Sequence, residues 1–314
     1  MRRTYSHSCR RSDGLSARAA HCNHQSGNPS IKPSAVTKLT AELDLPDLGS
    51  KRRKPSREIN LNSTSATLPP NFETEDTCFE RQLALVDRLM KSTSVVVPVV
   101  RQLFACMCFP YPCRRPFCSQ CGRSFRVWYT VELSKLAKTC RAQSQVVTII
   151  LKRVSLKDLR SVDLRAVKAR LRMNCVRLGL KDLPVCGGLE VAYDAKDNAF
   201  ILHAHLLVIG GTTNEWARLR PLFRKTNGPR AVKVQPLRDP PQQLSYLLKW
   251  VSYHRPGFQF GSHRARAVPL PLPALEELVA WWAQYEVSDF LFLHRMRVVA
   301  GHIKPTVSTA MRPP

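Results

Sequence analysis

The sequence lacks any hydrophobic run long enough to cross a bilayer. Its most apolar stretches, residues 95–100 and 290–293, are far shorter than the roughly 20 residues of a membrane-spanning helix. The first residues, MRRTYSHSCRRSDG, are basic and lack the apolar segment of a secretory signal. We therefore expect no membrane association and a cytoplasmic location, in which cysteines stay reduced.

Acidic residues are also scarce. The chain has 23 Asp and Glu against 49 Lys and Arg, and its formal net charge of +26 predicts attraction to a polyanion, most simply nucleic acid. A basic tail alone is the alternative, but arginine continues through the periodic part of the chain, where its planar donor fork suits phosphate. These arginines are Arg160, Arg165, Arg170, Arg172, Arg177, Arg218, Arg220, Arg224 and Arg230.

Residues 1–75 show no sustained apolar period. They are rich in Ser, Asn, Thr, Arg and Pro, which predicts a disordered basic arm. The basic run at residues 51–54 fits either a nuclear localisation signal or a flexible contact to DNA. A second region, residues 76–140, is expected to hold a short helix at 79–90 and a cysteine-rich segment.

From residue 145 onward the hydrophobic period orders the elements. We expect strands at 145–151, 189–193, 200–209 and 231–235, and helices at 159–178, 214–223 and 241–253. The order β-α-β-β-α-β followed by a helix predicts an α+β fold, a ferredoxin-like core with an antiparallel sheet over residues 141–260. A last amphipathic helix, 274–285, is assigned to a C-terminal helical extension, 261–314.

Two histidines share one face of a strongly apolar strand. Residues 200–208 read FILHAHLLV, so that His203 and His205 stand at positions i and i+2 and point the same way. Burying bare imidazoles is costly, so they need hydrogen-bond partners or a metal. For a lone histidine, a hydrogen bond to a neighbour would be the preferred explanation. For this pair within a hydrophobic strand, we favour ligation of a metal.

A third ligand is sought on the preceding strand. If the hairpin turns about Lys196 and Asp197, Glu190 lies opposite His203 and on the same face. A slip of one residue would send Glu190 to the other face. Two histidines and a carboxylate leave open positions for a phosphate oxygen on a catalytic ion. This mixed set favours Mn²⁺ or Mg²⁺, although the histidines alone would not exclude zinc.

An aromatic segment follows the last predicted strand. If residues 241–253 are helical, Tyr246, Lys249, Trp250 and Tyr253 share one face. Ordinary packing against the sheet is the alternative, and for Trp250 it can be the whole explanation. Tyr246 beside Lys249 also suits chemistry, since a phenol can attack a phosphodiester while lysine stabilises the developing charge.

Five of the 11 cysteines fall within residues 106–121. Cys113, Cys118 and Cys121 form a Cys-x4-Cys-x2-Cys pattern, which suits tetrahedral zinc once a fourth thiolate closes the site. We take Cys108 as that ligand, with Cys106 as the alternative. Unliganded buried cysteines would be the plainer explanation, but the density argues for a structural Zn²⁺. Three cysteines after this segment, Cys140, Cys175 and Cys186, are expected to be core residues.

These motifs together resemble those of the HUH endonucleases, and more narrowly the replication initiators of rolling-circle plasmids. The resemblance covers roughly residues 113–255: GGLEVAY at 187–193, the His-Ala-His strand, and YLLK at 246–249. A Cys-x4-Cys-x2-Cys segment followed by arginine, here Arg123 and Arg126, is also similar to one found ahead of the core in some initiators.

The resemblance implies a ferredoxin-like core, a Mg²⁺ or Mn²⁺ site on the paired histidines, and nicking of origin DNA through tyrosine. Two positions depart from the family pattern. Trp250 stands where a second tyrosine is common, and Ile201 stands where members often have a further histidine. Tyr246 is therefore the first candidate nucleophile, and Tyr253 is held in reserve.

The leading hypothesis is a plasmid replication initiator that nicks and rejoins single-stranded origin DNA through a 5′-phosphotyrosine intermediate. Such a role implies host helicase and polymerase as partners. A single-strand transposase of the same chemistry is the nearest alternative, because it can share a cysteine-rich segment, the histidine pair and a tyrosine helix. A noncatalytic zinc-dependent DNA-binding protein is the alternative from a different class.

Overall fold

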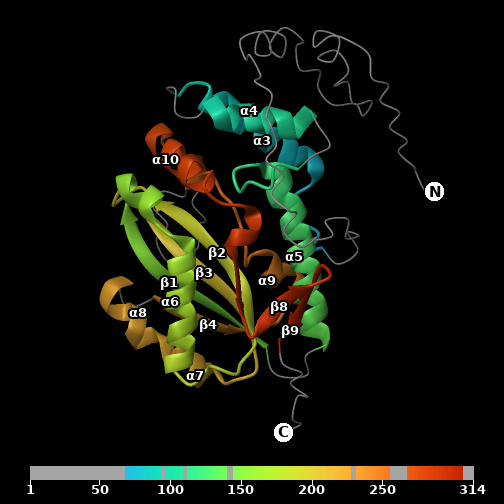
Figure 1. The fold of residues 1–314 in the computed structure, drawn as a ribbon, viewed down its shortest axis with the longest axis vertical. Helices are drawn as coiled ribbons and strands as arrows, with labels where there is room; N and C mark the ends of the chain where they lie inside the picture. Colours follow the sequence, from blue (N-terminus) through green and yellow to red (C-terminus); the bar gives the residue numbers. More distant parts are fainter. Residues whose placement is uncertain are drawn as a thin grey trace, which may run out of the picture. The chain divides into compact units, whose positions relative to one another are not determined.

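A five-stranded antiparallel sheet forms the centre of the structure (Figure 1). The computed structural model describes residues 68–92, 97–108, 112–139, 144–227, 231–254 and 267–306, which all belong to one compact unit. Most of the predicted basic arm, residues 1–67, lies outside the described residues, as does Cys140. None of the described helices combines the length and apolarity that a membrane span requires.

The strands follow one another across the sheet in the order β4-β1-β3-β2-β7, and each pairing is antiparallel. They are β1 (Ser144–Ser155), β2 (Val185–Asp194), β3 (Ala199–Ile209), β4 (Val232–Pro236) and β7 (Leu291–His294). The four strands expected from the β-branched and apolar runs are all present, and the fold is α+β as predicted. The fifth strand comes from the segment assigned to a helical extension.

The connections between these strands are largely helical. They contain η4 (Leu156–Ser161), α6 (Leu164–Arg177), α7 (Thr213–Ala217), α8 (Leu219–Asn227) and α9 (Pro240–Ser245). Two of these starts are capped by a side chain: Asp163 caps α6 by accepting from the Arg165 amide, and Thr212 forms a capping box with Glu215 at α7. Helix α6 lies across one face of the sheet (Figure 1).

The remaining elements come before β1 or after α9 in the chain. They are α3 (Glu75–Leu89), α4 (Val97–Cys108), α5 (Ser119–Thr139), β5 (Tyr253–His254), β6 (Val268–Pro269), α10 (Leu272–Trp282), η5 (Val287–Phe290), β8 (Met296–Val299) and β9 (His302–Pro305). The helices expected at 79–90 and 274–285 correspond to α3 and α10. The 21-residue helix α5 was not predicted, because its first turn lies within the cysteine pattern.

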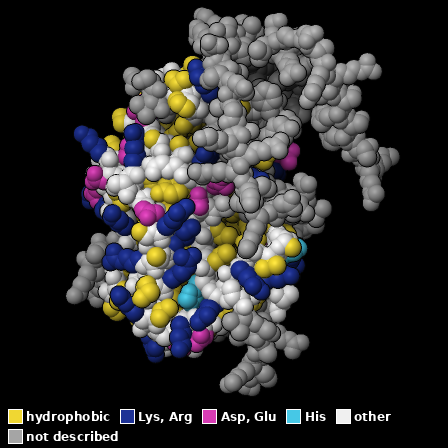
Figure 2. Space-filling model, in the orientation of Figure 1, with side chains coloured by type: hydrophobic (Ala, Val, Ile, Leu, Met, Phe, Trp, Pro, Cys, Tyr) yellow, Lys and Arg dark blue, Asp and Glu magenta, His cyan; other side chains and the backbone are white. Residues whose placement is uncertain are grey.

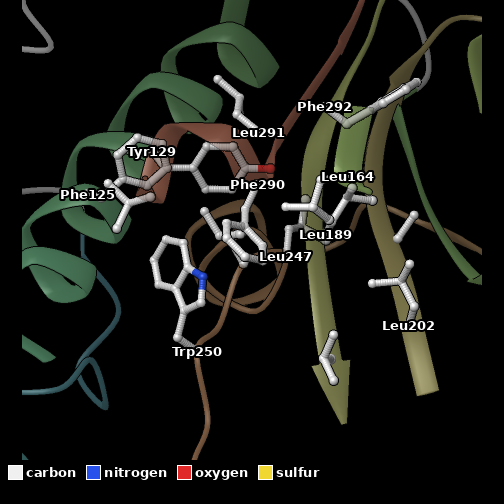
Figure 3. Close-up of a cluster of buried hydrophobic side chains, with 14 of the residues drawn as sticks. Phe125, Tyr129, Leu164, Leu189, Leu202, Leu247, Trp250, Phe290, Leu291 and Phe292 are labelled. Atoms are coloured by element: carbon white, nitrogen blue, oxygen red, sulfur yellow. The ribbon is translucent and has the colours of Figure 1, made fainter. Parts of the chain in front are cut away.

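Aromatic side chains join α5 to the segment that follows α9 (Figure 3). The Trp250 ring lies 5.9 Å from Phe125 of α5 and 5.9 Å from Phe290, measured between centroids. Trp250 is buried, so packing accounts for it. These contacts anchor the chain beside the sheet immediately after Lys249.

Side chains alternate along β3 in the way that a strand buried on one face requires. Leu202, Ala204 and Leu206 are buried, whereas His203 and His205 are only partly buried and point to the other face. The two imidazoles therefore stand on a partly buried stretch of this face, next to Leu207, which is fully buried on the same face.

Candidate functional site

The two histidines of β3 lie side by side. Their rings are stacked with centroids 5.9 Å apart and an interplanar angle of 7°. The pairing of β1 with β3 shifts register between Ile150 and Lys152, next to the partner position of His203. Such bulges re-aim side chains locally and are common beside active sites.

The hairpin register places Glu190 directly opposite His203, which confirms the predicted pairing of β2 and β3. The Glu190 carboxylate nevertheless bonds the neighbouring ring, with 2.9 Å between its Oε1 and Nε2 of His205. On the other side, Nδ1 of His205 lies 3.0 Å from Oγ1 of Thr148. The second oxygen of Glu190, Oε2, is buried and has no hydrogen-bond partner among the described residues.

Burial and charge set the protonation of this group. Burial lowers the pKa of His203 to about 4, so its imidazole is neutral at neutral pH. Burial raises the pKa of Glu190, but its electrostatic interactions with His205, His203 and Lys249 and its hydrogen bond with His205 hold it below its usual value. The site thus contains an ionised carboxylate and a neutral imidazole, which are donors suited to a divalent cation.

Gly188 brings the tyrosine segment onto this face. It pairs with His205, and a Cβ at Gly188 would lie 2.6 Å from the backbone oxygen of Leu247. Directly opposite positions share a face of the sheet, so the chain around Leu247 packs on the histidine side. Only a residue without a side chain permits that approach.

The predicted helix over 241–253 is wrong beyond Ser245. Helix α9 ends there, and Tyr246 is its C-cap residue. Tyr246, Lys249, Trp250 and Tyr253 therefore do not share a helical face: Trp250 is in the core, and Tyr253 is in β5, paired with Pro269. The expected helix gives way because Leu247, Leu248 and Trp250 are drawn into tertiary packing.

Tyr246 and Lys249 remain together despite the loss of the helix. The Lys249 Nζ lies 3.4 Å from the centroid of the Tyr246 ring, and 49% of the Tyr246 surface is exposed. The positive charge of Lys249 also helps to lower the pKa of Glu190.

Four cysteines gather at the start of α5. One ligand atom from each of Cys106, Cys113, Cys118 and Cys121 lies within 4.8 Å of all the others, and three of the Sγ–Sγ distances are 3.5–3.6 Å. Sulfurs bound to one tetrahedral zinc at ~2.3 Å would lie roughly 3.8 Å apart. This cluster can therefore hold a structural metal such as zinc. It is the one such group of three or more ligands among the described residues, and His203, His205 and Glu190 are less tightly gathered.

Among the described side chains, the fourth member of the cluster is Cys106, the alternative to Cys108 in the sequence prediction. The backbone of Cys108 ends α4, while its side chain lies outside the described part of the structure. Hydrogen bonds from neighbouring thiols lower the pKa of Cys106, and an amide of the chain, Arg114 N, donates to Cys121 Sγ at 3.3 Å. These features favour the thiolate at Cys106 and Cys121, whereas hydrogen bonds with Cys106 and burial raise the pKa of Cys113 and Cys118.

Several other predicted residues have structural roles. Cys175 and Cys186 are buried core residues, as expected. Arg123 and Arg126, which follow the cysteine pattern, form ion pairs with Glu75 at 3.2 Å and Glu73 at 3.4 Å. Neither arginine is therefore an uncommitted phosphate ligand.

Comparison of the chain with protein-family models, with curated proteins and with solved structures finds no match.

Proposed function

We propose that this protein nicks and rejoins single-stranded DNA, with Tyr246 as the nucleophile. One observation carries the proposal: Gly188 lets the Tyr246–Lys249 segment pack on the face of the sheet that bears His203, His205 and Glu190. A phenol, an ammonium group and a set of metal donors would then lie on the same face of the sheet. This combination suits phosphodiester transfer through a covalent tyrosine.

We further propose that the core is ferredoxin-like. The chain order β1, α6, β2, β3, α7 and α8, β4 and the sheet order β4-β1-β3-β2 support this, with β7 added at the edge beside β2. In this arrangement the two histidines stand on a central strand, where neighbours on both sides hold their orientation.

The donors on β2 and β3 suit Mg²⁺ or Mn²⁺. His203 is neutral, His205 is oriented by Thr148, and the buried Oε2 of Glu190 lacks a partner among the described groups. Binding to a cation would satisfy that oxygen. A divalent ion held there would neutralise charge on the phosphate that is attacked.

The reaction exchanges one phosphoester for another. The Tyr246 oxygen bonds to phosphorus as the bond to the 3′ oxygen breaks, and the phenol proton leaves to solvent. The freed 3′ oxygen takes a proton, while the 5′ end stays attached to the protein as a phosphotyrosine. Attack by a 3′ hydroxyl reverses the step and rejoins the strand. Lys249 places positive charge beside the phenol ring throughout.

Within this chemistry we favour a replication initiator of rolling-circle plasmids, with host helicase and polymerase as partners. A single-strand transposase would use the same residues and is distinguished by whether its cleavage sites flank an origin or the two ends of an element. In either case the four-cysteine cluster would hold a structural zinc that fixes α4 against α5.

The proposal is tested by incubating the full chain with Mn²⁺ and single-stranded oligonucleotides of randomised sequence. A covalent adduct should appear on a denaturing gel, and Tyr246→Phe should abolish it. Tyr253→Phe is the matched control and should retain the adduct. If the wild type forms none, the chain is a noncatalytic binding protein, and if only Tyr253→Phe loses it, the nucleophile is Tyr253.

A further inference from the structure

The hairpin of β8 and β9 is a separate two-stranded ribbon near the end of the described chain. Its turn residues Ala300 and Gly301 have φ values of 49° and 78°, which suits a two-residue turn that matches the twist of the strands. Met296 and Ile303 are buried on one face of the ribbon. The pairing places Arg297 opposite Lys304 and Val299 opposite His302 on the other face.

Helix α5 holds the ribbon in place. Trp128 Nε1 donates to the carbonyl oxygen of Gly301 at 2.6 Å, and the buried carboxylate of Glu132 accepts from the Ile303 amide at 3.3 Å. The same carboxylate lies 3.2 Å from Nδ1 of His302. These contacts order the ribbon without any partner.

The outward face of the ribbon is basic and unbalanced. Arg297 and Lys304 are both exposed and lie directly opposite each other, an arrangement in which like charges destabilise a sheet. No ion pair to either residue is found among the described residues. The chain therefore bears an electrostatic cost here that a polyanion bound to this face would relieve.

Basic residues continue beyond the ribbon. Arg295, just before β8, donates to the carbonyl oxygen of Lys181 and forms an ion pair with Asp182 at 3.4 Å, and Arg172 of α6 donates to the carbonyl oxygen of Leu293. These two bonds tie α6 and the loop after it to β7 and to the residue that precedes the ribbon. Figure 2 shows Lys and Arg side chains gathered on the face of the molecule that carries α6.

We propose that the outward face of the β8–β9 ribbon binds double-stranded DNA. The major groove is about 12 Å wide and admits a two-stranded ribbon, whose strands lie ~4.8 Å apart. Arg297 and Lys304 would then contact phosphates or base edges from a ribbon fixed by α5. This site does not depend on the nicking chemistry of Tyr246, and it would hold duplex DNA beside the strand that is cut.

The test is a titration of the full chain against a fluorescently labelled duplex of random sequence, followed by anisotropy at several salt concentrations. Arg297→Gln with Lys304→Gln should weaken binding about tenfold and reduce the salt slope by about 1.8, the value for two lost phosphate contacts. The matched control, Lys157→Gln with Lys196→Gln, removes the same charge from exposed positions elsewhere. An equal loss in both double variants would overturn the proposal.

A single variant separates binding from folding. Arg297→Glu places opposite charges across the ribbon, so it should raise or preserve the melting temperature while it weakens duplex binding more than Arg297→Gln does. Unchanged duplex affinity in Arg297→Glu would refute a DNA-binding ribbon. Tyr246→Phe should bind duplex normally, and Arg297→Glu should still form the single-strand adduct, so the two proposals can fail independently.

Discussion

Gly188 is the residue on which the proposed active site most depends. Its missing side chain admits the Leu247 backbone, so a single position in β2 determines whether the tyrosine segment reaches the histidine face. The sequence pattern contained Gly187 and Gly188 as part of a motif. It did not indicate what would fill the space, because that segment is about sixty residues further along the chain.

We predict that Gly188→Ala displaces the tyrosine segment. The added Cβ would meet backbone, which cannot rotate away as a side chain can, so we expect a loss of about 1–3 kcal/mol in the free energy of unfolding and a loss of adduct formation. Gly179→Ala is the control: nothing lies within 4 Å of its Cβ position, although its φ of 76° also disfavours alanine. That variant should lose stability but keep adduct formation. Equal activity in both variants would contradict the role of Gly188.

The second prediction concerns Glu190. Glu190→Gln keeps an oxygen for the bond to His205 but removes the negative charge, so Mn²⁺ affinity should fall at least about tenfold. Electron paramagnetic resonance of free Mn²⁺ measures this directly, without any DNA. Glu80→Gln, at an exposed position on α3, should leave Mn²⁺ binding unchanged. If Glu190→Gln binds as tightly as the wild type, the carboxylate is not a ligand.

Among the elements, strands were easier to predict than the helix that carries the tyrosine. The β2–β3 register could be derived because the turn around Lys196 and Asp197 is short and polar. The predicted helix ran past the end of α9 because residues 246–253 have a helical apolar period. In the structure, burial of Leu248 and Trp250 overrides that local preference. Strands β7, β8 and β9 have four residues each. A hydrophobic period cannot distinguish so short a strand from a loop or a helix.

The cysteine cluster connects α4, the loop after it and α5, so its metal should stabilise that whole region. We predict about one zinc per chain by elemental analysis, and a lower melting temperature after treatment with a strong chelator. Cys106→Ser should lose the metal, whereas Cys108→Ser should keep it, because four ligands are already supplied. The reverse result would restore Cys108 as the fourth ligand.

Net charge is the property of the whole molecule that the sequence indicates most clearly. The net charge of +26 predicts binding to nucleic acid but does not locate it. The structure separates the basic residues: Arg123 and Arg126 are paired with glutamates, while Arg297 and Lys304 face outward from a ribbon. Two surfaces then have distinct roles in our account, one for the strand that is cut and one for duplex DNA.

The central claim is that Tyr246 becomes covalently joined to DNA. The most direct measurement is mass spectrometry of the Mn²⁺-dependent adduct after digestion with nuclease and trypsin. Our account predicts a nucleotide phosphate on the peptide of residues 239–249, which contains Tyr246 as its only tyrosine. A modified peptide from any other part of the chain would contradict it.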